Sequence, residues 1–262
     1  MLHNFKLTLA YDGTAYCGWQ IQPNGVTIQE ILQEKIALIL RHQVTLIGSG
    51  RTDSGVHAAG QIAHFHYHDS IELFRFQGSL NALLPRDIRI LAVEEVALDF
   101  HAQHSAKSKT YHYHMHLDHV LDPFIRLYRL HVKEKVDIDL MRKAARLFVG
   151  EHDFTSFANE AHSGSASQNA VRTMRRLDIV DQPGGVRLEF EADGFLYKMV
   201  RNITGTLLEV ARGKRPIDDI NKILAAKDRR YAGQAAPPQG LFLMHVQYKS
   251  GVIHLTNNDH ID

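Results

Sequence analysis

The sequence FKLTLA at Phe5–Ala10 gives the first indication of the fold, because its apolar and polar side chains alternate. An alternation with a period of two is typical of a strand that buries one face. The pair Asp12-Gly13 marks the end of this strand. The sequence TIQE at Thr27–Glu30 is a capping box, which begins helices, and apolar residues follow it at helical spacing. The chain therefore opens with a strand and an amphipathic helix.

Both halves of the chain continue this alternation of strands and helices. The first half has further strand patterns at 44–47, 61–67 and 88–96 and a helix pattern at 76–84; the second has strand patterns at 111–117, 175–180, 186–191 and 241–248 and helix patterns at 140–149, 198–211 and 217–226. This order is typical of ferredoxin-like units. We therefore predict an α+β fold in which two ferredoxin-like (RRM-like) halves, 1–105 and 106–262, form one extended antiparallel sheet. Helices would cover one face of this sheet, with a cleft on the other.

Composition limits the classes of function. The chain has 262 residues, with Lys+Arg 30 against Asp+Glu 29, so its formal charge is +1. A near-zero charge argues against a uniformly basic, non-specific nucleic-acid binder and leaves room for a local basic cleft. Cys17 is the only cysteine, which fits a reducing compartment. With no long apolar segment at the N-terminus or elsewhere, we expect no signal peptide and no membrane span.

The stretch GSGRTDSGVHA at Gly48–Ala58 is the most informative for chemistry. Its three glycines let the backbone turn tightly and approach a ligand. A guanidinium and a carboxylate, Arg51 and Asp53, lie two positions apart in this turn. Asp53 also fits a purely structural role as the cap of the turn. A phosphate-binding loop is disfavoured because the stretch lacks the Lys-Ser/Thr ending of a P-loop.

Together with other motifs, this stretch resembles the tRNA pseudouridine synthase A family, whose signature centres on Gly-Arg-Thr-Asp followed by Gly-Val-His. Further pieces similar to the family occur in the family's order and extend to about Tyr248. They are YDGT at 11–14, GWQ at 18–20, NALLP at 81–85, FHA at 100–102, KTYHY at 109–113, HDFTSF at 152–157, FLYKMVRNI at 195–203 and GLFL at 240–243. Because so many motifs follow in order, the resemblance covers nearly the whole chain.

The resemblance implies an enzyme that isomerises uridine to pseudouridine at positions 38 to 40 of the tRNA anticodon stem-loop. The N1–C1′ glycosidic bond breaks, the uracil turns, and C5 bonds to C1′. No redox change occurs and no group is lost, so the reaction requires neither a cofactor nor a metal. The resemblance also implies a cytoplasmic homodimer that binds tRNA. A catalytically silent RNA-binding protein on the same scaffold is the alternative.

By resemblance, Asp53 is the essential catalytic carboxylate, and Arg201 is its partner. Burial disfavours a charged carboxylate, and a hydrogen-bonded guanidinium opposes that effect. Arg201 lies off the apolar stripe of its predicted helix, and Gly205, one turn later, leaves room beside it. Spacing alone also fits an exposed helix arginine. Whether Asp53 attacks C1′, attacks C6 or abstracts a ribose proton stays open.

Two further residues match family positions that hold the uracil. Tyr111 matches the tyrosine that stacks on the base, and it shares one strand face with Tyr113. Leu241 resembles the leucine that packs against the base from the other side. Both residues also fit plain core positions, because aromatic and aliphatic residues are common inside sheets.

The remaining candidates concern RNA binding. Arg51 is carried over as the residue that helps to hold the target nucleotide out of its stack, although it could instead pair with Asp53. The FHA motif places Phe100 and His101 at a tRNA contact. The family usually continues with an arginine and an aromatic residue, whereas this chain has Gln103 and His104. That departure puts one contact in doubt, and His104 is a substitute donor or cation.

Alternating histidines favour a third hypothesis, a metal-dependent hydrolase. They lie at positions 64, 66 and 68 and at positions 112, 114 and 116. Histidines on one strand face can chelate a metal ion. Polar strand residues that face RNA or solvent explain both runs equally well, and we expect no metal site. Between the helix pattern at 140–149 and the strand pattern at 175–180, the Ser-, Ala- and Gly-rich stretch 158–168 predicts a mobile loop.

Overall fold

A computed structural model describes residues 1–159 and 169–249. The chain divides into two compact units, and each is described by itself. Unit 1 comprises Met1–Lys107 and the chain from His245 onward, and unit 2 comprises Ser108–Met244. Both units combine helices with mostly antiparallel strands. The predicted α+β class is therefore confirmed.

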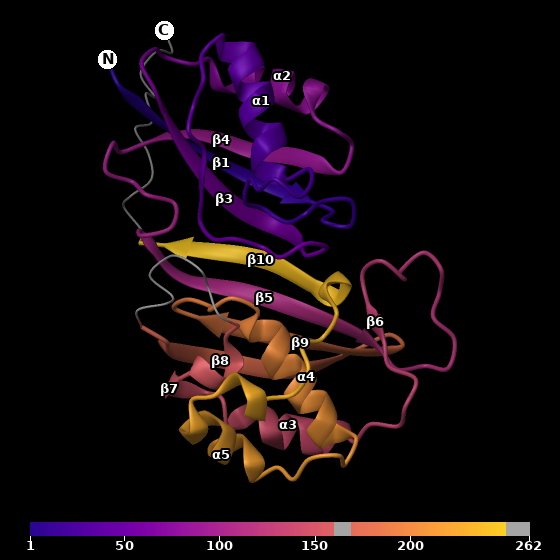
Figure 1. Cartoon of the computed structure of the whole chain (residues 1–262). Helices are drawn as coiled ribbons and strands as arrows, with labels where there is room; N and C mark the ends of the chain where they lie inside the picture. Colours follow the sequence, from indigo (N-terminus) through magenta and orange to yellow (C-terminus); the bar gives the residue numbers. More distant parts are fainter. Residues whose placement is uncertain (160–168, 250–262) are drawn as a thin grey trace, which may run out of the picture. The chain divides into compact units, whose positions relative to one another are not determined.

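Unit 1 is a small sheet with two helices on it. Its elements are β1 (His3–Tyr11), α1 (Ile28–Leu40), β2 (Ile47–Gly48), β3 (His57–Tyr67), α2 (Leu73–Leu83) and β4 (Ile88–Val96). β1 is the central strand, antiparallel to β3 on one side and to β4 on the other, while β2 pairs with β3. Figure 1 shows α1 and α2 together in front of these strands.

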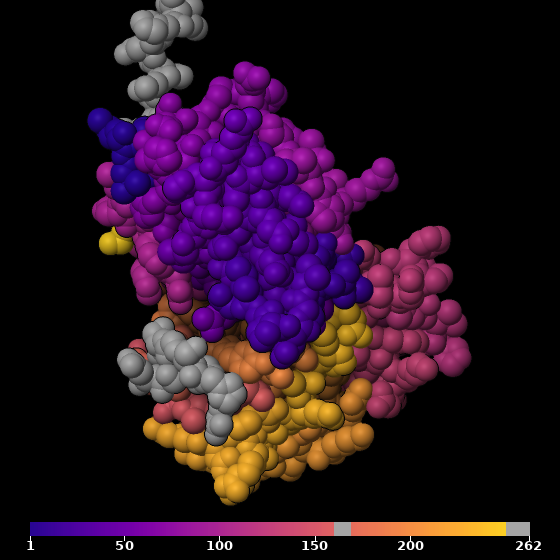
Figure 2. Space-filling model, turned by 45° about the horizontal axis from the view of Figure 1, so that its top comes forward, coloured from indigo at the N-terminus to yellow at the C-terminus, as the bar shows by residue number. Residues whose placement is uncertain are grey.

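The core of unit 1 lies between β1 and its helices. The apolar side chains of β1, including Phe5 and Leu7, are fully buried, as are Ile28 and Leu32 of α1. The Thr27 hydroxyl accepts the Glu30 N–H at 3.4 Å, so this half of the predicted capping box begins α1. Figure 2 shows the indigo and violet residues of this unit as one solid surface on the side that faces the viewer.

The described residues of unit 2 form strands of very different length and three α-helices. Its elements are β5 (Ala106–His116, beginning in unit 1), β6 (Leu130–His131), α3 (Ile138–Arg146), β7 (Gly150–Asp153), η1 (Thr155–Phe157), β8 (Val171–Gln182), β9 (Gly185–Ala192), α4 (Met199–Ala211), α5 (Asp219–Ala226), η3 (Arg229–Tyr231), η4 (Pro238–Gly240) and β10 (Leu241–Tyr248, ending in unit 1). The strand order β5-β9-β8-β7 is antiparallel throughout. Figure 1 shows α3 and α4 in front of β8 and β9.

The predicted hairpin in unit 2 is present. β8 and β9 are joined at Pro183-Gly184-Gly185, and Gly184 has a φ of +72°, which a glycine adopts without strain. The helix α4 is almost completely buried between α3 and the neighbouring segments, since only Arg201 and Glu209 along it are half-exposed. Its burial fixes the direction of each side chain that leaves it.

Two further predictions from the sequence concern a loop and membrane-spanning helices. The predicted loop at 158–168 falls, apart from its first two residues, outside the described residues. In the described ranges 1–159 and 169–249, no helix is long and apolar enough to cross a membrane.

Candidate active site

The loop that carries Asp53 joins β2 to β3 in unit 1. Asp53 is half-buried, and Thr52, directly before it, is 6% exposed. The hydroxyls of Thr52 and Tyr11 are hydrogen bonded at 2.8 Å, and the Trp19 N–H donates to the Thr52 carbonyl at 3.1 Å. Burial raises the pKa of Tyr11 to about 12, so its hydroxyl stays protonated at neutral pH. The residue next to Asp53 is thus held through both its side chain and its backbone.

Two glycines let the segment after β1 lie directly against this loop. A Cβ atom on Gly18, whose φ is +84°, would lie 2.5 Å from the Thr52 carbonyl oxygen. A Cβ atom on Gly13 would lie 2.0 Å from the Val56 carbonyl oxygen. Both distances are far inside van der Waals contact, so the two backbones meet only where a side chain is absent. Gly13 of the motif YDGT and Gly18 of the motif GWQ therefore permit the close backbone contacts that fix the loop on both sides of Asp53.

The start of the loop is fastened to β3 by a buried glutamine. The Ser49 hydroxyl donates to Gln61 Oε1 at 2.6 Å, and Gln61 Nε2 donates to the Gly50 carbonyl at 3.0 Å. Ser49 and Gln61 are both 0% exposed. We gave neither residue a role from the sequence. The available signal was a glutamine at a position where the strand otherwise buries apolar side chains.

Arg51 lies on the surface of unit 1, two residues before Asp53. Its Nε donates to Gln20 Oε1 at 3.2 Å. Gln20 belongs to the motif GWQ, which adjoins the loop through Trp19. An exposed guanidinium supported at one nitrogen is available to a phosphate through its other nitrogens.

The turn of the FHA motif presents its members differently. Phe100 is 1% exposed, and its ring packs at 5.0 Å from Tyr248, so this residue anchors the turn. His101 is half-buried, and its Nδ1 accepts the N–H groups of Gln103 and His104, each at 3.2 Å. The side chains of Gln103 and His104 are exposed. Only these last two and the edge of His101 face outward.

In unit 2, Tyr111 lies on β5 and Leu241 lies on β10, and both side chains are buried. Tyr111 is 7% exposed, and its ring meets Phe195 edge to face at 5.0 Å. Leu241 is 5% exposed at the start of β10. Phe195 belongs to the motif at 195–203, but the sequence alone predicts no role for it. The only signal for such a role is that an aromatic residue lies six positions before Arg201.

Arg201 is oriented by a backbone segment that crosses α4. Its Nε donates to the Ala236 carbonyl at 2.7 Å, and the Ala236 N–H donates back to the Arg201 carbonyl at 2.9 Å. A Cβ atom on Gly205 would lie 1.7 Å from the Gln234 carbonyl oxygen. The space that Gly205 leaves is therefore filled by this segment, which accepts the hydrogen bond from Arg201.

Tyr113 closes the same neighbourhood. Its hydroxyl donates to the Pro237 carbonyl at 2.7 Å, which fixes the chain just beyond Ala236. Burial raises the pKa of Tyr113 well above its usual value, and the positive charge of Arg201 opposes that shift only in part. The tyrosine thus stays a neutral hydrogen-bond donor beside the guanidinium.

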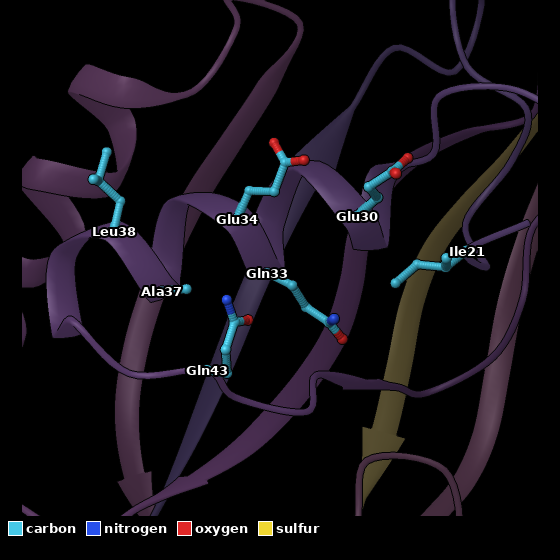
Figure 3. A pocket seen from close by; sticks show the side chains of 7 residues that line it. All are labelled: Ile21, Glu30, Gln33, Glu34, Ala37, Leu38 and Gln43. Atoms are coloured by element: carbon cyan, nitrogen blue, oxygen red, sulfur yellow. The ribbon is translucent and has the colours of Figure 1, made fainter.

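An open hollow lies on α1 in unit 1. It has a volume of about 440 Å³ and is lined by Ile21, Glu30, Gln33, Glu34, Ala37, Leu38 and Gln43. Figure 3 shows Glu30 and Glu34 on successive turns of α1 along its edge. Two carboxylates there repel phosphate groups, so this hollow is unsuited to a nucleic acid.

The metal-hydrolase hypothesis needs several ligands in one place. Within residues 1–159 and 169–249, no group of three or more His, Cys, Asp or Glu side chains is arranged to hold a metal ion. The histidine runs instead make contacts with one another and with the backbone, as between His64 and His66, whose ring centroids are 5.7 Å apart.

Comparison with known proteins identifies the family. The family model described as tRNA pseudouridine synthase matches residues 8–105 and 144–249, which is more than half of the chain. The chain belongs to this family.

Its similarity to individual members extends over almost the full length of both proteins. It is 61% identical over 250 residues to tRNA pseudouridine synthase A 1 of Protochlamydia amoebophila, covering 95% of this chain and 98% of that protein. It is 46% identical to tRNA pseudouridine synthase A of a Geobacter species, covering 94% and 99%. It is 43% identical to that of Chlamydia muridarum, covering 99% and 97%.

Proposed function

We propose that this protein isomerises uridine to pseudouridine in tRNA, at positions 38 to 40 of the anticodon stem-loop. The observation that carries the proposal is the family match across both units, which includes the Asp53 loop and the Arg201 helix. In the reaction the N1–C1′ bond breaks, C5 bonds to C1′, the C5 proton leaves, and N1 gains a proton. Substrate and product are isomers, so atoms and electrons balance without a co-reactant.

Asp53 acts in its ionised form on the target nucleotide. The rigid attachment of its loop supports this role, since a catalytic group must be held in a productive geometry before the substrate arrives. Its carboxylate attacks C1′, attacks C6, or removes a ribose proton. Arg201 serves as the cation that keeps the carboxylate charged, and the hydrogen bond from its Nε to the Ala236 carbonyl helps to orient the guanidinium for that task.

Tyr111 and Leu241 hold the uracil between them. Tyr111 offers a ring whose one edge is already packed on Phe195, which limits its rotation and prepares it for stacking. Leu241 offers an apolar surface for the opposite face of the base. Both residues require a nucleotide taken out of its stack, at a cost of a few kcal/mol.

The RNA is bound by Arg51 and by the turn of Phe100, His101, Gln103 and His104. Arg51 replaces part of the interactions that the extracted nucleotide loses. Gln103 and His104 are exposed and supply donors to the backbone, and His101 orients them. Phe100 supports the turn from below. Because phosphate contacts dominate, we expect the affinity for tRNA to fall with rising salt.

We further assign the protein to the cytoplasm and to a homodimer that binds one tRNA across both copies. The single cysteine fits a reducing compartment. The size of a tRNA relative to one chain supports a site shared by two copies. Sedimentation with and without tRNA tests the dimer directly.

The test of the function uses tRNA with tritium at uracil C5. We expect the wild-type protein to release tritium as C5 bonds to C1′, and sequencing to place pseudouridine at positions 38 to 40. A matched tRNA with cytidine at these positions should release none. Tight binding of tRNA without any release would contradict the proposal and favour the silent RNA-binding protein. Release that survives a strong chelator would remove the metal-dependent hydrolase.

A further inference from the structure

His64 is a buried histidine in unit 1 that has no role in the proposed reaction. It lies on β3 and is 1% exposed. On one side it faces the turn of the FHA motif, since its ring centroid is 4.9 Å from that of His101. On the other side it is paired with Ile47 of β2, directly before the glycine-rich loop that carries Asp53.

Both ring nitrogens of His64 have backbone partners. Nδ1 accepts the Ala102 N–H at 3.2 Å. The ring also makes a hydrogen bond to the backbone of Ile47, which raises the pKa of the ring. Because Nδ1 is already an acceptor, we assign the donor of this second bond to Nε2. Ala102 is 0% exposed, and its N–H would lack a partner without this ring nitrogen. One imidazole therefore connects the centre of the FHA turn to β2.

This double contact requires the neutral ring, because a protonated histidine has no acceptor nitrogen. Burial, together with the nearby His101 and His66, lowers the pKa of His64 to about 4. No carboxylate is among the groups that shift it. At neutral pH the ring thus keeps one donor and one acceptor.

We propose that His64 is a positioning residue that holds the tRNA-contacting turn at 100–104 in register with β2 and the Asp53 loop. It touches neither the base nor the ribose and acts through Ala102 and Ile47. The role of the turn rests on the proposed function, whereas the connection itself rests on the hydrogen bonds. Gln61, three residues earlier on β3, fastens Ser49 and Gly50 of the same loop. β3 thus carries two buried polar side chains, Gln61 and His64, that bind neighbouring backbone or side chains of the two connected segments.

Two substitutions separate the two contacts. The amide of His64→Asn reaches the position of Nδ1 and can accept from Ala102, whereas the longer amide of His64→Gln reaches the position of Nε2 and can donate to Ile47. We expect His64→Gln to raise the KM for tRNA about ten-fold with little change in kcat, because a buried N–H loses its acceptor in the binding turn. We expect His64→Asn to keep KM and to lower kcat a few-fold. His42→Gln, an exposed histidine of the same unit, is the matched control and should change neither.

Amide hydrogen exchange gives a second readout that does not depend on activity. In the wild-type protein the Ala102 amide should be strongly protected at pH 7 and should lose protection selectively near pH 4. At pH 7 it should be unprotected in His64→Gln and protected in His64→Asn. Equal protection in both variants, or equal KM and kcat effects, would overturn the proposal. Wild-type protein without activity would refute the proposed function instead, and the exchange pattern would still decide on His64.

Discussion

The Asp53 loop in unit 1 and the Arg201 region in unit 2 are held in place by different means. The loop is enclosed by backbone on several sides, and Gly13 and Gly18 allow contacts that no side chain permits. Arg201 projects from a buried helix, and its Nε donates to the backbone carbonyl of Ala236. In the first region backbone packs directly on backbone, whereas the second combines a buried helix with a side chain that is oriented by hydrogen bonding.

This difference indicates which changes each region tolerates. An added methyl group in the loop moves the backbone next to Asp53, and a displacement of about 1 Å in a catalytic group costs on the order of a hundred-fold in rate. A change at Arg201 leaves α4 intact and affects only the direction or the number of its donors. We therefore expect glycine substitutions to have larger effects than conservative changes of the charged side chain.

The largest effect of this kind is expected for Gly18→Ala. The new Cβ would press on the Thr52 carbonyl at a residue with φ of +84°. Strain and overpacking should lower the free energy of unfolding by about 3 kcal/mol, and kcat/KM should fall about a hundred-fold or more. Thermal unfolding and tritium release measure the two quantities.

Gly78→Ala is the matched control, because Gly78 lies inside α2 and a Cβ there meets nothing within 4 Å. This substitution should stabilise the protein by about 0.5–1 kcal/mol without changing the activity. Similar activities for the two alanine variants would show that the loop is not rigidly enclosed.

In unit 2, two substitutions test separately how Arg201 is oriented. Gly205→Ala changes the close approach of the Gln234 backbone to α4, and Arg201→Lys changes the hydrogen bond to Ala236. The Gly205 methyl group would push the segment around Gln234 off α4, and we expect a loss of about 2 kcal/mol in stability and a ten-fold or larger loss in kcat. Lysine at 201 keeps the charge but loses the planar fork that binds Ala236, which should lower kcat about ten-fold at unchanged stability. A stable Arg201→Lys variant with wild-type kcat would remove the directing role of Ala236.

The smallest effect concerns two histidines with lowered pKa values, the buried His64 in unit 1 and the half-buried His112 in unit 2. Burial lowers the pKa of His64 and of His112 to about 4, although Glu189 opposes the shift at His112. Between pH 6.5 and 4 the unfolded chain binds protons that the folded one does not, so stability falls as pH falls through this range. We expect a loss of roughly 1–3 kcal/mol between pH 7 and 4.5.

His64→Gln and His112→Gln should each flatten part of this pH dependence, as measured by chemical unfolding at several pH values. A wild-type stability that stays constant from pH 7 to 4.5 would contradict the neutral state of both rings.

Much of the secondary structure follows from the sequence because its signals are local. The strands at 88–96 and 241–248 were predicted with the bounds that β4 and β10 have. The capping residue of α1 was also predicted, since a cap acts within one turn. The helix α2 begins at Leu73, earlier than the predicted 76, because the Glu72 side chain accepts the Arg75 N–H.

The predicted strand at 44–47 was wrong for most of its length, and long-range contacts explain why. The Leu46 N–H donates to Gln33 Oε1, and the Leu46 carbonyl accepts from Gln29 Nε2. Two side chains of α1 thus satisfy the backbone that a neighbouring strand would otherwise pair with, and β2 has only Ile47–Gly48. Apolar alternation shows which side chains are buried but not which groups bind the backbone.

The residues of the candidate site also fall into two groups, those that a local sequence pattern marks and those that it does not. Asp53, Tyr111, Arg201 and Leu241 were predicted because motifs mark them, and their roles stay predictions. The residues that orient them, Gln61, Phe195 and Ala236, had no such mark. Ala236 contributes only a carbonyl, which every residue has, and its contact with Arg201 joins positions 35 residues apart. A contact of this kind depends on the tertiary fold and leaves no local pattern.

The most direct test of the proposed chemistry is tritium release by Asp53→Asn, with Asp69→Asn, an exposed aspartate of the same unit, as the control. The substitution keeps the shape of the side chain and removes its charge. We predict an unchanged fold, an unchanged affinity for tRNA and a loss in kcat of about a thousand-fold or more, with wild-type kcat for Asp69→Asn. Comparable turnover by Asp53→Asn and the wild-type protein would contradict the assignment of Asp53 as the catalytic carboxylate.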